Sequence, residues 1–248
     1  MIPPNNKQAK WSETGFSLME LLVVLLIVGV LMAILFPTVQ KVRSKMDEAG
    51  CISNLRQMAT AANSYMAEHN GLWPPNRTGG PVFSNALIPY LGESVPVKGD
   101  PRFKKSVFVC PGDKGVPGAP ENNYNHQGLY TPASFTDPVT NKTGKYAISY
   151  AQNVYATVGD RTSSNQTFNR NEVELASKMM LFMDFRGHYI TSLARFNDEA
   201  LVEDLNGRHQ GRWNAAFVDG SVRPILHSDV PLKTSDLPHP FFQGRTKN

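Results

Sequence analysis

The sequence predicts an α+β protein in which one long N-terminal helix packs on a small antiparallel β-sheet with long loops. First, sixteen residues from Leu21 to Phe36 follow one another without a polar side chain. Second, the apolar residues beyond this run recur every three or four positions, which is the period of an amphipathic helix. Third, short segments rich in β-branched and aromatic residues follow from Gly71 onward, separated by turn residues.

The apolar segment has the length of a membrane-spanning helix. Phe16 to Phe36 is 21 residues. A helix of that length covers about 31 Å, which matches a bilayer core of about 30 Å. A removable secretory signal is the alternative, but its apolar region usually stops at about 15 residues and ends in a small-residue pattern that "FPTVQKVRSK" lacks. We therefore predict a retained membrane segment at 16–37, with the costly charge of Glu20 near its beginning.

The amphipathic part is expected to continue the same helix over residues 38–70. Pro37 lacks an amide hydrogen and should kink the helix, Gly50 is a second weak point, and "NGLWPP" ends the element. The expected helix of about 50 residues is about 75–80 Å long. A coiled coil is the alternative, disfavoured by the frequent alanines. The apolar stripe consists of Val39, Val42, Met46, Ala49, Ile52, Leu55, Ala59, Ala62 and Met66.

A β-rich globular domain is expected at 71–248. Asp219-Gly220 in "VDGSV" predicts a hairpin, because this pair suits a tight turn with positive φ. Trp73 and Trp213 are expected in the core or at its rim. The Pro-, Gly- and Asn-rich segments 74–105 and 111–145 are predicted to be surface loops. The predicted strands are "SVFVC", "YAISYA", "NVYATV", "KMMLFMDF", "HYITSLA" and the two arms of "NAAFVDGSVRPIL".

The composition excludes two classes of protein. With 41% hydrophobic and 19% charged residues the chain is a folded protein rather than a disordered one. The net charge of +4 is small and scattered, and no run of five or more Lys or Arg occurs. We therefore expect no nucleic-acid partner.

The segment "GFSLMELLVVLLIVGVLMAILFP" resembles the N-terminus of type IV pilins and of the pseudopilins of type II secretion systems. In these proteins a short polar leader ends in Gly, an aromatic residue begins the mature chain, Glu stands fifth, and a Pro interrupts the apolar helix. Gly15, Phe16, Glu20 and Pro37 stand in those places. The resemblance implies a prepilin leader at 1–15. A prepilin peptidase would remove it between Gly15 and Phe16 and methylate the new amino terminus at Phe16.

The resemblance also implies an assembly role for Glu20. Cleavage leaves a cation at the Phe16 nitrogen, and a carboxylate near lipid is costly unless it is paired. Glu20 is therefore expected to pair with the amino terminus of a neighbouring subunit and so to set the register of a filament. The alternative is a headgroup-level residue of a plain signal anchor, whose carboxylate reaches water.

Orientation and partners follow from the same resemblance. Lys7 and Lys10 precede the apolar segment, and Lys41, Arg43 and Lys45 follow it, so the lysines and arginines alone leave the orientation open. The resemblance implies a single-pass protein of the bacterial inner membrane, with a cytoplasmic N-terminus and an extracytoplasmic domain, in the periplasm or in a surface filament. The implied partners are other pilin or pseudopilin subunits, the prepilin peptidase, an inner-membrane assembly platform and membrane lipid.

A second resemblance concerns the C-terminal part. "HQGRWNAAFVDG" places nine residues between His209 and Asp219-Gly220, a signature of a group of prepilin-type proteins. Its members tend to carry a Cys before "NLRQ" in the helix and a Cys-Pro after a short strand, here Cys51 and Cys110. In an oxidising compartment these two cysteines predict one disulfide, which closes a loop of roughly 60 residues and stabilises the fold by about 4 kcal/mol. Two buried free thiols are the alternative.

Catalytic and metal-binding roles find little support in the sequence. His209 and Asp219, with Asp184 or His188 nearby, offer acid/base groups, but no nucleophile or phosphate-loop motif accompanies them. We expect no enzyme, and we expect His209 and Asp219 to brace a hairpin. No cofactor is expected. Calcium is the alternative, without assigned ligands because no Asp-x-Asp-x-Asp spacing occurs. Its candidate carboxylates are Asp184, Asp198, Asp204 and Asp219.

The expected function is that of a non-enzymatic filament subunit, a pseudopilin of a type II secretion-like system. Two alternatives share the same anchor. One is a minor subunit of a surface type IV pilus. The other is a membrane-anchored extracytoplasmic binding module that does not polymerise.

Overall fold

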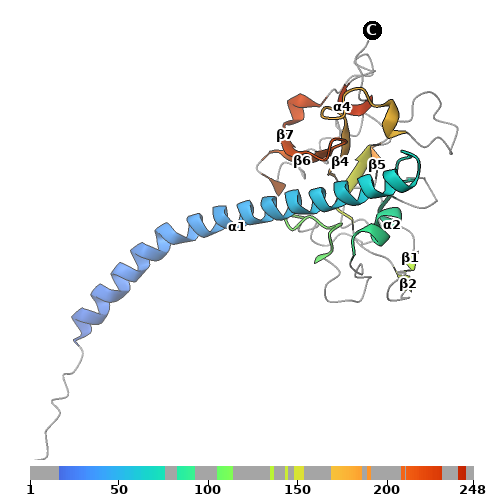
Figure 1. Ribbon diagram of the computed structural model, residues 1–248. Helices are drawn as coiled ribbons and strands as arrows, with labels where there is room; N and C mark the ends of the chain where they lie inside the picture. Colours follow the sequence, from blue (N-terminus) through green and yellow to red (C-terminus); the bar gives the residue numbers. More distant parts are fainter. Residues whose placement is uncertain are drawn as a thin grey trace, which may run out of the picture. The chain divides into compact units, whose positions relative to one another are not determined.

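A computed structural model of the chain describes residues 17–75, 83–92, 105–113, 135–136, 143–144, 148–153, 169–185, 189–190, 208–209, 211–230 and 240–243. The chain divides into two compact units, Met1–Arg43 and Ser44–Asn248, and each is described by itself. Helix α1, Leu18–Glu68, begins in the first unit and ends in the second (Figure 1). The predicted combination of one long N-terminal helix with a small sheet is confirmed.

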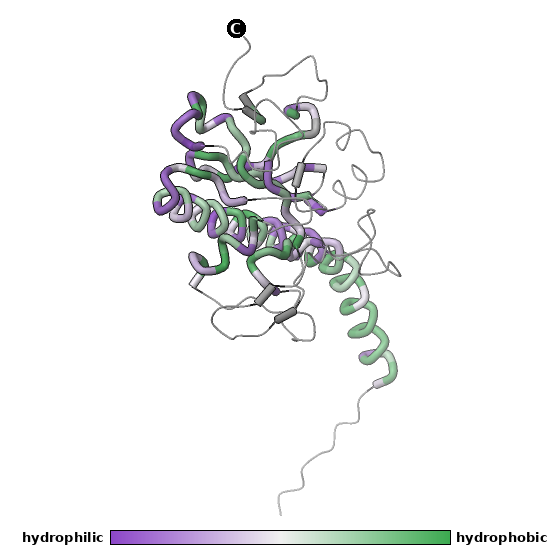
Figure 2. Tube along the Cα trace, turned by 90° about the vertical axis from the view of Figure 1, so that its right-hand side faces the viewer, coloured by the Kyte–Doolittle hydropathy of each residue, from purple (hydrophilic) through white to green (hydrophobic). Residues whose placement is uncertain are grey.

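The first unit contributes the apolar half of α1. Every side chain from Leu21 to Phe36 is exposed, and this half of the helix is the long hydrophobic stretch in Figure 2. The helix continues through Pro37 without ending there. The kink expected at Pro37 stays a prediction.

In the second unit, one stripe of α1 enters the core. The sequence predicted a stripe from Val39 onward, and this start is wrong. Among the described residues, the core contains α1 side chains only from Cys51 onward. Val39, Val42 and Met46 are instead exposed. The buried positions of α1 are Cys51, Leu55, Met58, Ala59, Ala61, Ala62 and Met66.

The main sheet has five strands in the order β5-β3-β4-β6-β7. Four of them are antiparallel neighbours, as predicted, whereas β5 lies parallel to β3 at one edge. A separate antiparallel pair joins β1, Phe135–Thr136, to β2, Thr143–Gly144. The strands of the main sheet are β3 Tyr150–Asn153, β4 Met180–Asp184, β5 Tyr189–Ile190, β6 Trp213–Phe217 and β7 Val222–Ile225.

The two faces of this sheet belong to different hydrophobic clusters. Phe182 and Ala216 share a cluster with α1 and with the short helix α2, Phe83–Leu87. Met180 and Met183 point to the opposite face, where the short helix α4, Pro240–Gln243, adds aromatic side chains. An irregularity in the register between Met180 and Phe182 lets Leu181 and Phe182 both join the α1 cluster.

The β6–β7 connection is a hairpin, as predicted. Phe217 N donates to Ser221 O at 2.8 Å, and Gly220 N donates to Phe217 O at 2.9 Å. Gly220 has a φ of 86°, the positive value that the three-residue loop requires. Asp219 Oδ1 accepts from the backbone and hydroxyl of Ser221, so Asp219 stabilises its own turn.

Two sequence predictions are wrong in this unit. "SVFVC", residues 106–110, forms turns rather than a strand; Ser106 O and Cys110 O accept turn hydrogen bonds from Val109 N and Asp113 N. Residues 83–90, predicted as loop, form α2 and a 3₁₀ turn at Ile88–Tyr90. Phe83 packs its ring 4.9 Å from that of Phe182, which is why this segment lies in the core. Trp73 and Trp213 are buried, as expected.

Further 3₁₀ turns span Arg170–Glu172 and His227–Asp229.

Candidate functional site

The N-terminus of α1 carries a capping box formed by Ser17 and Glu20. The backbone N–H of Ser17 donates to Glu20 Oε2 at 3.0 Å, and the N–H of Met19 donates to Ser17 Oγ at 3.3 Å. The first N–H groups of a helix have no partner within it, so these two side-chain bonds satisfy donors that would otherwise be unpaired. The Ser-x-x-Glu spacing is the signal for this box, and the sequence analysis missed it.

The capping role leaves Glu20 able to bind a further cation. A carboxylate has about four lone-pair positions, and the bond from Ser17 N uses a single position at Oε2. Glu20 is exposed in the single chain. Gly15 and Phe16, the predicted cleavage and methylation residues, lie outside the described residues.

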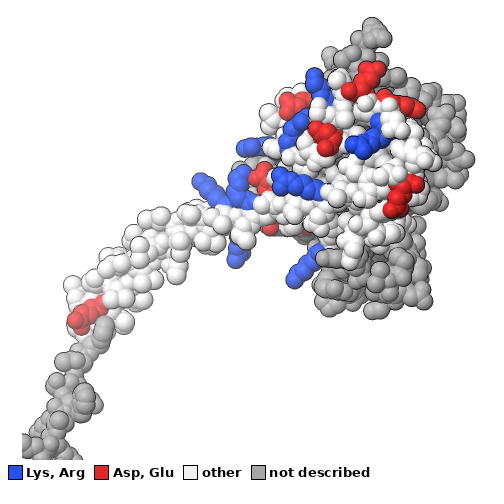
Figure 3. Space-filling model, in the orientation of Figure 1, with Lys and Arg blue, Asp and Glu red and all other residues white. Residues whose placement is uncertain are grey.

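The apolar half of α1 is not packed against any other described part of the chain. Its large side chains are all exposed, with exposed fractions between 41% for Val23 and 87% for Leu18. A contiguous apolar surface of this kind marks a membrane or protein contact. Figure 3 shows this stretch without basic side chains in that view, followed along the helix by Lys and Arg. Among the described residues, α1 is the one helix that is long and apolar enough to cross a membrane.

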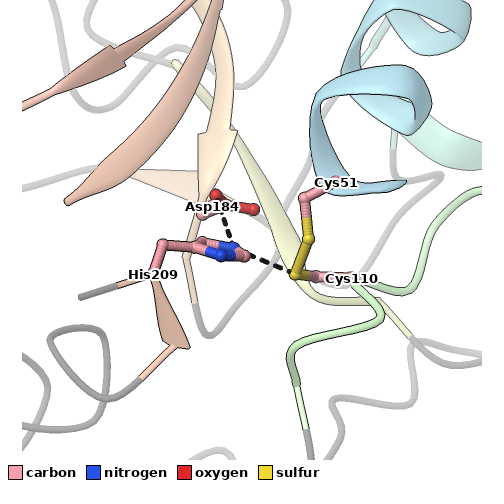
Figure 4. Close-up of side chains that lie close together, drawn as sticks. All are labelled: Cys51, Cys110, Asp184 and His209. Atoms are coloured by element: carbon pink, nitrogen blue, oxygen red, sulfur yellow. Dashed lines mark hydrogen bonds and ion pairs between the residues drawn. A yellow bond between two sulfur atoms is a disulfide. The ribbon is translucent and has the colours of Figure 1, made fainter. Parts of the chain in front are cut away.

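A second concentration of functional groups lies in the core of the globular unit. Cys51 of α1 forms a disulfide with Cys110, with Cα atoms 5.0 Å apart, which confirms the predicted bridge (Figure 4). Its two sulfur atoms, a carboxylate oxygen of Asp184 and a ring nitrogen of His209 all lie within 4.8 Å of one another. All four residues are buried.

The sheet places Asp184 against this disulfide. Asp184 is the last residue of β4 and pairs with Tyr150 across the ladder, so both side chains point to the α1 face. Asn214 of β6 lies on the same face, since its neighbours Trp213 and Ala215 belong to the opposite cluster. Asn214 donates to Asp184 Oδ2 through its backbone N–H at 3.0 Å and its Nδ2 at 2.9 Å.

His209 stands between Asp184 and Cys110. Its Nε2 lies 3.3 Å from Asp184 Oδ2 and 3.2 Å from Cys110 Sγ. A carboxylate and a disulfide sulfur only accept hydrogen bonds, so Nε2 carries the proton here. His209 Nδ1 and Asp184 Oδ1 are buried, and neither has a hydrogen-bond partner among the described residues.

An ion pair adjoins the cluster. Arg208 donates to Asp113 with an N–O distance of 2.8 Å, and both side chains are almost fully buried. Ser149 Oγ also donates to Asp113 Oδ2, at 2.7 Å. Gly112 lies between the cysteine and this pair: a Cβ on it would stand 3.1 Å from His209 Cε1, so a residue without a side chain is what fits beside the imidazole.

Tyr150 connects the cluster to α1. Its hydroxyl accepts from Asn54 Nδ2 at 3.3 Å, and Asn54 Nδ2 also donates to Val109 O at 2.9 Å. Burial, together with the nearby charge of Asp184, raises the pKa of Tyr150 well above its usual value. The neutral phenol therefore persists in the folded chain.

The contacts of the C-terminal signature residues differ from the prediction. His209 pairs with Asp184, whereas Asp219 sits in the exposed β6–β7 turn, so the expectation that His209 and Asp219 together brace the hairpin is wrong. The reason is the length of β6: His209 precedes this strand and Asp219 follows it, so the whole strand separates the two residues. Sequence reasoning missed the parts played by Asp113, Arg208 and Asn214. His188, Asp198 and Asp204 lie outside the described residues.

Comparison with known proteins gives two matches. The chain is 32% identical over 63 residues to a ComG operon protein 3 homolog of Bacillus licheniformis, covering 25% of this chain and 65% of that protein. It is 32% identical over 76 residues to the type IV major pilin protein PilE of Neisseria gonorrhoeae, covering 31% of this chain and 45% of that one. The matches thus span less than two thirds of each relative's length. No family model and no solved structure matches.

The fold and the anchor define a membrane-anchored α+β protein with one long N-terminal helix. The two matches together with this apolar helix support a type IV pilin-like family for the chain. The resemblance inferred from "GFSLMELL" is confirmed at this level.

Proposed function

We propose that this protein is a non-enzymatic filament subunit, which is inserted in the membrane by α1 and assembled through Glu20 after cleavage between Gly15 and Phe16. The observation that carries the proposal is the exposed apolar half of α1 with one carboxylate at its beginning. Packing of such helices against one another would cover the apolar surface, and a positive amino terminus from a neighbour would pair with Glu20.

The capping box is compatible with this proposal. Ser17 would be the second residue of the processed chain, and its N–H occupies one position at Glu20 Oε2, which leaves the rest of the carboxylate for a cation. Like subunits that stack with an axial stagger would bring one subunit's terminus to another's carboxylate. We propose the same division of the chain as the sequence predicted: leader 1–15, membrane segment 16–37, amphipathic continuation 38–70 and extracytoplasmic domain 71–248.

Two kinds of filament suit this subunit. The sequence pattern favoured a pseudopilin of a type II secretion-like system, in the inner membrane with its domain in the periplasm. The similarity to the type IV major pilin protein PilE favours a surface pilus. Secretion of a reporter protein and surface display of the domain distinguish the two in a deletion strain.

The test separates the two roles of Glu20. Glu20→Gln keeps an acceptor for Ser17 N–H, as Gln does in a capping box, but removes the negative charge. Glu20→Ala removes both. We expect both variants to be processed and membrane-inserted, and both to be excluded from filaments, as measured by shearing and sedimentation. Glu48→Gln is the matched control, because Glu48 lies outside the apolar segment and pairs with Lys45, which is exposed.

Normal incorporation of Glu20→Gln would overturn the assembly role and leave Glu20 as a helix cap alone. Normal incorporation of both variants would favour the alternative, in which Glu20 is a headgroup-level residue of a plain signal anchor.

A further inference from the structure

We propose that Cys51, Cys110, Asp184 and His209 form a four-ligand Zn²⁺ site when the disulfide is reduced, so that this buried centre holds either a disulfide or a metal ion. The inference is independent of filament assembly. It rests on a set of four potential ligands within 4.8 Å of one another, drawn from α1, the 105–113 segment, β4 and the residues before β6.

The spacing agrees with tetrahedral zinc. With Zn–N and Zn–O bonds of about 2.0 Å and Zn–S bonds of about 2.3 Å, the ligand edges are about 3.3 Å for N–O and about 3.5 Å for N–S. The observed distances from His209 Nε2 are 3.3 Å to Asp184 Oδ2 and 3.2 Å to Cys110 Sγ. The two sulfurs, which are bonded in the disulfide, must separate to about 3.8 Å. The remaining donor–donor distances lie within 4.8 Å.

The chemistry of the donors also suits zinc rather than calcium. Two thiolates, one imidazole and one carboxylate are ligands that zinc accepts, whereas calcium takes six to eight oxygens, roughly. Asp184 Oδ2 is already oriented by two hydrogen bonds from Asn214, in the way that outer partners orient a metal-binding carboxylate.

One unsatisfied atom points the same way. Asp184 Oδ1 is buried without a hydrogen-bond partner among the described residues, whereas buried polar groups normally have one. A metal at the centre would bind Asp184 through either oxygen, and His209 through Nε2 once the proton moves to Nδ1.

Conversion of the disulfide state to the metal-bound state requires a reductant, either a thiol or a phosphine. The reductant gives two electrons, the Cys51–Cys110 S–S bond breaks, and two thiols form while the reductant is oxidised. Zn²⁺ then displaces one proton from each thiol and the proton from His209 Nε2, which is taken up at Nδ1. Two protons are released overall for each ion bound.

The experiment uses the full chain in a non-denaturing detergent. The chain is reduced with a phosphine until thiol titration counts two thiols per chain, and Co²⁺ is then added without oxygen. We expect one Co²⁺ per chain, with the strong visible absorption of a tetrahedral cobalt–thiolate centre, and displacement by Zn²⁺. The unreduced chain should give no such spectrum.

Matched variants test each ligand. His209→Gln and Asp184→Asn should each weaken Co²⁺ binding by more than about tenfold. The controls are His69→Gln, which changes an exposed histidine, and Asp219→Asn, which changes an exposed carboxylate. These two should bind as the unaltered chain does.

Three results would overturn the proposal. One is a reduced, folded chain that gives no tetrahedral spectrum. Another is binding that is unchanged in both His209→Gln and Asp184→Asn, since the thiols alone would then hold the ion. If the reduced chain is unfolded by circular dichroism, Zn²⁺ should refold it, because such a site binds only the folded state; failure to refold is the third.

Discussion

The guanidinium of Arg208 lies 2.8 Å from the carboxylate of Asp113, and the two side chains are 4% and 1% exposed. This pair joins the segment before β6 to the turn after Cys110, next to the disulfide. Loss of one partner leaves the other charge buried without this ion pair. We expect Arg208→Met to lower the free energy of unfolding by about 3–5 kcal/mol. Denaturant unfolding in detergent measures this.

A half-exposed pair of similar length is the control. Lys45 and Glu48 approach to 2.7 Å, and their side chains are 56% and 13% exposed. Lys45→Met should cost less than about 1 kcal/mol. Equal losses at the two sites would contradict the view that burial, rather than distance, decides the effect. The double variant Arg208→Met/Asp113→Leu should lose less than Arg208→Met alone.

The Cys51–Cys110 bond closes a separation of 59 residues in sequence. A loop of this length restricts the unfolded chain, so the Cys51→Ser/Cys110→Ser variant should lose about 4 kcal/mol of unfolding free energy. Thiol titration of the denatured, unreduced chain should find no free thiol. Two free thiols per chain in protein taken directly from the membrane would contradict the bridge.

Gly50 lies where the Cys110 turn approaches α1. A Cβ on Gly50 would stand 2.9 Å from Cγ of Pro111, closer than such contacts occur. Gly50→Ala should therefore destabilise the chain, although alanine is favoured over glycine by about 1 kcal/mol in an unhindered helix. In a Pro111→Ala background the sign should reverse. A stabilising Gly50→Ala in the unaltered chain would contradict the close approach.

Tyr150 makes stability fall in alkali. Its folded pKa is raised by burial, so its contribution is complete below the unfolded pKa of about 10 and is lost as the pH rises above that value. Between these two pKa values the slope is about 1.4 kcal/mol per pH unit. Tyr150→Phe removes that slope. Unfolding free energies of both proteins, measured from pH 9 to pH 11, check the difference; parallel curves would contradict it.

Much of the architecture follows from local patterns in the sequence. The period of the helix, "KMMLFMDF" and the Asp219-Gly220 turn predict α1, β4 and the β6–β7 hairpin, because each depends on near neighbours. The parallel β5 edge and the α2 segment were not predicted, since contacts distant in sequence place them. "SVFVC" has strand composition, but Val109 N donates to Ser106 O within the segment, which therefore forms a turn.

The buried cluster shows the same limit. The sequence identifies Cys51, Cys110 and His209 as noteworthy, but it does not pair His209 with Asp184. That pairing depends on the alignment of Asp184 with Tyr150 in the sheet and on the face that Asn214 occupies. The capping box at the N-terminus of α1 is different, because Ser17 and Glu20 are only three residues apart in sequence. Their hydrogen bond could have been predicted from the Ser-x-x-Glu spacing alone.

Processing of the leader is what a membrane-anchored filament subunit requires. The intact mass of the full protein, extracted from membranes of a strain that carries a prepilin peptidase, measures it. We expect the loss of residues 1–15 and the gain of one methyl group on Phe16. A chain that keeps its leader in that strain would show that the protein is not such a subunit.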